Sequence, residues 1–83
     1  MRASSLTHLT IANVSEQLFV DDVVSVSIPG TEGVMTLLAH HAALITLLRP
    51  GTIIVTLDNG EKKDFSVTGG TVEVSNNQIT ILI

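Results

Sequence analysis

Alternating apolar and polar side chains predict β-strands along most of this chain. Residues 24–28 read Val-Ser-Val-Ser-Ile, and residues 9–13 read Leu-Thr-Ile-Ala-Asn. Because successive side chains of a strand point to opposite faces, each segment is expected to bury one face and expose the other. A short apolar run at residues 18–20 is followed by Asp21 and Asp22, which we interpret as a solvated turn at the end of a separate strand.

Residues 34–48 fit two interpretations. The spacing of their leucines matches one face of a helix, whereas the β-branched residues among them favour strands. No N-capping residue precedes a periodic run, so we predict two strands joined by a loop through Ala39, His40, His41 and Ala42. Four apolar side chains of this region are expected in the core: Met35, Leu37, Leu44 and Leu47.

Turn signals divide the chain at short intervals. Pro29-Gly30 ends a strand, Asn59-Gly60 predicts a type I′ hairpin turn, and Ser75-Asn76-Asn77 predicts a further turn. Gly69-Gly70 indicates a bulge or a tight bend. Closely spaced breaks of this kind are typical of β-sandwiches and barrels. We therefore predict that residues 1–83 form one all-β domain, a small β-sandwich of about eight to ten short strands.

The composition supports a small strand-rich domain and excludes several functions. Hydrophobic residues make up 45% of the 83 residues and aromatic residues only 2%, so the apolar mass is Val, Ile and Leu, which favour strands. A net charge of −4 argues against nucleic-acid binding, and the absence of cysteine excludes disulfides and thiolate chemistry. No apolar run resembles a signal peptide or a membrane span. A core this small is expected to gain stability from an obligate partner.

The search for catalytic and metal-binding patterns is largely negative. His40 and His41 are adjacent, and neighbours on a strand point to opposite faces, so they could share one ion only from a bent loop. No cysteine or further histidine lies near them in the sequence to complete a structural zinc site. Neither a Gly-x-Ser-x-Gly elbow nor a phosphate-binding glycine loop is present. The sequence argues against an enzyme, and a metal-dependent enzyme built on the two histidines stays open as an alternative.

Two longer segments carry a more specific pattern. Residues 30–51 read GTEGVMTLLAHHAALITLLRPG, and residues 68–82 read TGGTVEVSNNQITIL. The first is similar to a glycine-rich turn, an apolar strand, a histidine loop and a strand that ends in Lys-Pro-Gly. The second is similar to a Gly-Gly segment followed by Asn-x-(Val/Ile)-Thr-(Val/Ile)-Leu. On these motifs the chain resembles, over nearly its whole length, the epsilon subunit of bacterial and plastid F-type ATP synthases.

Two departures from that family's pattern affect what the resemblance implies. Ala39 and Ala43 stand where the family has loop prolines, so the histidine loop is expected to be less rigid. The family continues into two C-terminal helices, whereas this sequence ends at Ile83. We therefore expect the β-sandwich without the C-terminal helical hairpin, and nothing of the regulation by those helices is carried over.

The resemblance implies a non-catalytic central-stalk subunit, part of the rotor, that binds the gamma subunit and the c-ring. Such a subunit helps to couple ion translocation to ATP synthesis and needs no cofactor or small-molecule substrate of its own. The implied location is peripheral, on the cytoplasmic face of the bacterial plasma membrane rather than on the plastid thylakoid. An alternative is a free-standing β-sandwich that binds a protein or peptide by adding a strand at its edge.

The same resemblance implies where the partner docks. We expect a ring-facing patch, although the histidine loop within it could instead contact the gamma subunit. The patch is expected to contain Glu32, Val34, His40 and His41.

Overall fold

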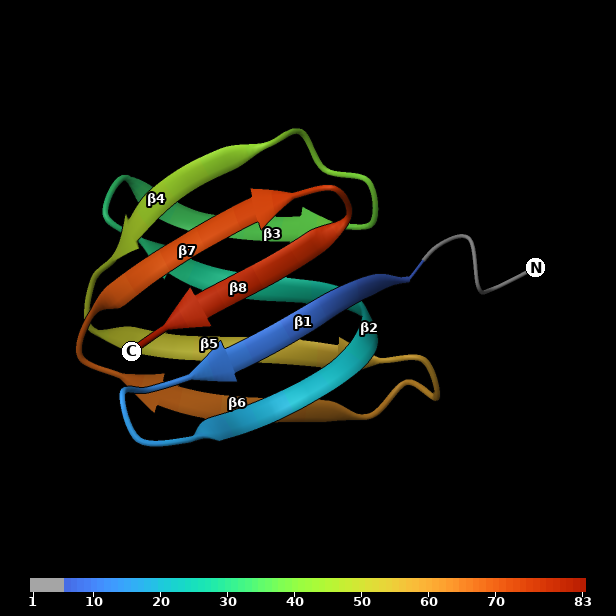
Figure 1. The fold of residues 1–83 in the computed structure, drawn as a ribbon, viewed down its shortest axis with the longest axis horizontal. Helices are drawn as coiled ribbons and strands as arrows, with labels where there is room; N and C mark the ends of the chain where they lie inside the picture. Colours follow the sequence, from blue (N-terminus) through green and yellow to red (C-terminus); the bar gives the residue numbers. More distant parts are fainter. Residues whose placement is uncertain (1–5) are drawn as a thin grey trace.

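The computed structural model describes residues 6–83, and every regular element in these residues is a β-strand (Figure 1). The strands are β1 (Thr7–Ala12), β2 (Gln17–Gly30), β3 (Gly33–Leu38), β4 (Leu44–Leu48), β5 (Gly51–Leu57), β6 (Lys62–Val67), β7 (Gly70–Ser75) and β8 (Gln78–Leu82). The all-β prediction is confirmed, as is the choice of two strands and a loop over a helix in residues 34–48. No helix in the described part of the chain is long and apolar enough to cross a membrane.

The strands form two layers that face each other across the core (Figure 1). One layer has the order β4-β7-β8-β1 and is extended by the first half of β2; β1 and β8 run parallel, and the other neighbours are antiparallel. The second layer has the order β3-β2-β5-β6 and uses the second half of β2. Gly30 at the end of β2 also pairs with Leu48 of β4. The result is the predicted β-sandwich, closed by a strand that belongs to both layers.

Strand β2 is longer than the sequence pattern predicts. Asp21 and Asp22 do not form a turn, because they lie exposed within β2, paired with β1. The register against β5 then shifts by one residue between Val23 and Ser25. This bulge places Val23 in the core, whereas strict alternation would have placed Val24 there. Since a bulge bends its strand and increases the twist, it explains how one strand passes between the two layers.

The core lies between the layers and is almost entirely aliphatic. Alternate residues of each strand point inward, as the strand geometry requires. At one margin the rings of Phe19 and Phe65 meet edge to face, with centroids 5.7 Å apart, and close the gap between β2 and β6. The core consists of Leu9, Ile11, Val23, Val26, Ile28, Leu37, Leu48, Ile53, Val55, Val67, Val72, Val74, Ile79 and Ile81.

The core positions predicted for β3 and β4 are confirmed in part. Leu37 is fully buried, and Met35 and Leu44 are partly buried against the core. The prediction for Leu47 is wrong, because this side chain is 56% exposed. In β4 the inward position belongs to its neighbour Leu48, and adjacent residues of a strand cannot share a face.

The turn types differ from the sequence prediction at one hairpin. Residues 58–61 connect β5 and β6, and among them Gly60 alone has a positive φ, of 91°, so Asn59-Gly60 does not form a type I′ turn. The N–H of Gly60 donates to the carbonyl of Leu57 at 2.9 Å, and the N–H of Leu57 donates to the carbonyl of Glu61 at 2.8 Å, so Leu57 and Glu61 close a hairpin loop of three residues. Positive φ at both central residues occurs instead at Asn76 and Asn77, with values of 53° and 58°, between β7 and β8.

Candidate docking site

The four residues expected to form one patch lie at the two ends of strand β3. Glu32 lies in the β2–β3 turn with Val34 just beyond it, whereas His40 and His41 lie in the β3–β4 loop. In Figure 1 the turn is at the left end of β3 and the loop is at its right end. The six residues of β3 span about 20 Å, so the structure does not bring all four side chains together.

The turn that carries Glu32 is held by backbone hydrogen bonds to the end of β4 and the residue that follows it. The N–H of Thr31 donates to the carbonyl of Leu47 at 3.1 Å, and the N–H of Arg49 donates to the carbonyl of Pro29 at 2.9 Å. These bonds anchor the β2 side of the turn while the Glu32 side chain stays exposed. The turn therefore presents one carboxylate on a fixed backbone.

The loop that carries the histidines has an unusual backbone at His40. Its φ is 61°, in the left-handed region that residues with a Cβ seldom adopt. The N–H of His41 donates to the carbonyl of Leu38 at 3.3 Å, and Nδ1 of His41 lies 2.9 Å from the carbonyl oxygen of Ala42. A further bond joins the N–H of His40 to Oδ1 of Asn77 at 2.7 Å. The loop is thus fixed at several points, although Ala39 and Ala43 lack the rigidity of proline.

Apolar side chains are exposed along the two strands that flank the histidine loop. Val34 on β3 is 77% exposed and Ile45 on β4 is also 77% exposed, while Leu38 and Leu47 are exposed by 53% and 56%. Strand β3 belongs to one layer and β4 to the other, so these side chains form two separate apolar strips, and exposed aliphatic strips are a mark of protein interaction surfaces. The strands on either side of the loop therefore favour protein docking over catalysis.

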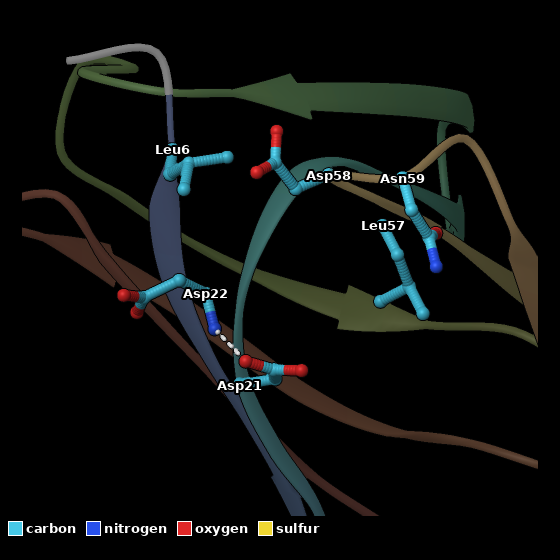
Figure 2. A pocket seen from close by; sticks show the side chains of 6 residues that line it. All are labelled: Leu6, Asp21, Asp22, Leu57, Asp58 and Asn59. Carbon is cyan, nitrogen blue, oxygen red and sulfur yellow. Dashed lines mark hydrogen bonds between the residues drawn. The ribbon is translucent and has the colours of Figure 1, made fainter. Parts of the chain in front are cut away.

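A hollow of about 540 Å³ lies between the start of β1, the middle of β2 and the β5–β6 hairpin (Figure 2). It is acidic and open to solvent. Oδ1 of Asp21 accepts the N–H of Asp22 at 2.8 Å, and Asp22 also pairs with Nδ1 of His8 at 2.9 Å. Across residues 6–83, no group of three or more metal-ligating side chains gathers, here or at the histidine loop. The lining residues are Leu6, Asp21, Asp22, Leu57, Asp58 and Asn59.

Sequence reasoning missed the contribution of Asn77 to the histidine loop. The available signal was the pair Asn76-Asn77 between two strands, since asparagine tolerates positive φ and suits a two-residue turn. The Asn-Asn pair predicts the turn but not the contact with the histidine loop. The contact with His40 spans 37 positions of the sequence and depends on the tertiary arrangement of the two layers.

Comparison with known proteins connects this sandwich to one family. Residues 6–83 match the family model described as ATP synthase, Delta/Epsilon chain, beta-sandwich domain. The ATP synthase epsilon chain of Protochlamydia amoebophila is 40% identical over 74 residues, which cover 89% of this chain and 50% of that relative. The epsilon chain of Nitratiruptor sp. is 41% identical over 75 residues, covering 90% and 58% respectively. The chain thus spans about half the length of the curated relatives it matches.

Solved structures give the same result for the fold. A chain in the Euglena gracilis mitochondrial ATP synthase structure, which includes the c-ring, superposes with a TM-score of 0.87 at 26% identity. The match covers 95% of this chain and 50% of that one. A chain in the Tetrahymena thermophila mitochondrial ATP synthase central stalk and c-ring structure gives a TM-score of 0.74 at 19% identity, covering 90% and 60%.

Proposed function

Because the chain belongs to the beta-sandwich domain family of ATP synthase delta and epsilon chains, we propose that it is a non-catalytic subunit of the ATP synthase rotor. In this role it docks on the gamma subunit and on the c-ring in the central stalk and helps to couple ion translocation to ATP synthesis. The observation that carries the proposal is the match of residues 6–83 to the family model, together with relatives named epsilon chain. The Euglena gracilis neighbour, from a structure that contains the c-ring, supports the same assembly.

The proposed role requires a mechanically stiff domain rather than a catalytic site. A subunit between ring and stalk transmits torque, and a densely packed interior deforms little under load. The aliphatic core and the strand shared by both layers supply that stiffness. In this proposal residues 1–83 act as one domain at the membrane periphery, on the cytoplasmic face in a bacterium, without cofactor or substrate.

We assign docking to both ends of β3. The anchored turn presents the Glu32 carboxylate with exposed Val34 beside it, which suits the polar loops of the c-ring. A net charge of −4 favours approach to a basic partner surface through charge complementarity. The histidine loop, with His40 and His41, lies at the opposite end and suits a second contact, with the gamma subunit or with another part of the ring.

Removing both docking side chains is expected to weaken the complex. For the double variant Glu32→Ala with His41→Ala, we expect the affinity for a purified assembly of gamma subunit and c-ring to fall by about tenfold or more, as expected when hydrogen-bonded contacts to charged groups are lost. Calorimetric titration measures the affinity. Each single variant then reports on one end of β3.

A matched control is available on the same molecule. Glu61 is an exposed acid of the β5–β6 hairpin, outside the proposed contacts, and Glu61→Ala is expected to leave the affinity unchanged. Undiminished affinity of the double variant would contradict the assignment of these side chains to the interface.

A further inference from the structure

Asn77 lies where three segments of the chain meet: its own β7–β8 turn, the start of β1 and the β3–β4 loop. Its side-chain Oδ1 accepts the N–H of His40 at 2.7 Å, and its Nδ2 donates to the carbonyl of Leu6 at 2.9 Å. Its backbone carbonyl accepts the hydroxyl of Thr7 at 2.8 Å and the N–H of His8 at 3.2 Å. One residue therefore bonds to both neighbouring segments.

The two side-chain bonds require a carboxamide. The partner in the loop is an N–H donor and the partner at β1 is a carbonyl acceptor, so only one orientation of the amide satisfies both. The φ of 58° at Asn77 is also one that asparagine accepts readily. The turn thus requires a residue that accepts a positive φ at position 77, and the loop contact requires a carboxamide side chain there.

The loop needs such a contact because His40 has a left-handed backbone, with φ at 61°. A residue with a Cβ keeps this conformation only when its surroundings hold it there. We propose that Asn77 is a positioning residue that holds the β3–β4 loop in its docking conformation by fixing the backbone of His40 to the start of β1. This inference rests on the docking role of that loop proposed above.

The test compares two neighbouring substitutions in the same turn. Asn77→Gly removes the carboxamide but keeps the turn, because glycine accepts positive φ. Asn76→Gly is the matched control, since Asn76 is exposed and has the same backbone conformation at φ 53°. Amide hydrogen exchange reports on loop order, and the affinity for the gamma subunit and c-ring assembly reports on docking.

In the Asn77→Gly variant we expect the His40 amide to exchange about tenfold faster, while the amides of β8 keep their protection. We expect the affinity for the assembly to fall by about fivefold, because the loop must then be ordered on binding. Asn76→Gly is expected to change neither quantity. Faster exchange at His40 alone reports a loss of order in the loop, because a general loss of stability would also speed exchange in β8.

Three outcomes would overturn the proposal. Unchanged exchange at His40 in Asn77→Gly would show that the amide does not order the loop. Faster exchange with unchanged affinity, in a protein whose His41→Ala variant binds weakly, would show that docking does not need the ordered loop, and the proposed function would stand. Full affinity of His41→Ala together with His40→Ala would instead remove the loop from the interface and overturn both this inference and the docking role assigned to the loop, while the proposed rotor function would stand.

Discussion

Replacing Gly70 with alanine is expected to lower the free energy of unfolding by about 2–4 kcal/mol, through backbone strain and overpacking together. Gly70 begins β7 with a φ of 140°, a conformation that residues with a Cβ rarely adopt. A Cβ at this position would lie 2.3 Å from the carbonyl oxygen of Leu82 and 3.0 Å from Cγ2 of Ile83. Because the closest of these atoms belongs to the backbone, the β7–β8 pair itself would have to move.

The neighbouring glycine provides the control for this prediction. A Cβ on Gly69 would meet nothing closer than the carbonyl oxygen of Leu48 at 3.9 Å. Gly69→Ala is therefore expected to change the free energy of unfolding by less than about 1 kcal/mol. Urea unfolding of both variants measures the difference, and equal stabilities would contradict the account of the close approach at Gly70.

Truncating Ile81 to alanine is expected to cost about 2–5 kcal/mol of unfolding free energy, the range for large-to-small changes in a closed core. Ile81 has no exposed surface and lies in β8, between Ile11 of β1 and Val72 of β7. Since small domains have only about 5–15 kcal/mol of stability in total, the variant is expected to be partly unfolded at moderate urea concentrations.

The next residue of the same strand points the other way. Leu82 is 51% exposed, so Leu82→Ala removes a similar side chain without opening a cavity. Its expected cost is below about 1 kcal/mol. If Ile81 points into the core and Leu82 points outward, the urea unfolding curves of the two variants are expected to have equal slopes and clearly separated midpoints. Coincident midpoints would count against this orientation of the two side chains.

Alternation along the sequence was sufficient to predict the fold class, but it could not show where a strand changes layers. The bulge between Val23 and Ser25 inserts one residue, and beyond it the inward set begins again at Val26. No residue type in that segment marks the bulge. The exposed pair Asp21 and Asp22 resembled a turn because charged neighbours usually end strands, yet pairing with β1 satisfies their backbone.

Turn type depended on loop length more than on the residue pair. Asn59-Gly60 suits a two-residue hairpin, but the ends of β5 and β6 leave a longer loop in which Gly60 alone has positive φ. Asn76 and Asn77 meet the two-residue requirement because Ser75 and Gln78 pair directly. Strand register, a tertiary property, decides between such cases.

The candidate docking residues were grouped because they lie in one sequence motif, but in the structure the length of β3 keeps them apart. Glu32 and His40 lie at opposite ends of β3, because a strand of six residues is fully extended. That separation could have been predicted from the sequence once the strand between them was accepted. The bond from Asn77 to His40 could not, because it links segments brought together only by the packing of the two layers.

The central claim is that this sandwich is a rotor part that docks on the gamma subunit and the c-ring. The most direct measurement is titration of the whole chain into a purified assembly of these two components, followed by size-exclusion chromatography of the product. We expect one chain to bind each assembly with a dissociation constant below about 1 µM, corresponding to about 8 kcal/mol of binding free energy. A chain that elutes as a free monomer and shows no heat of binding at saturating assembly would contradict the claim.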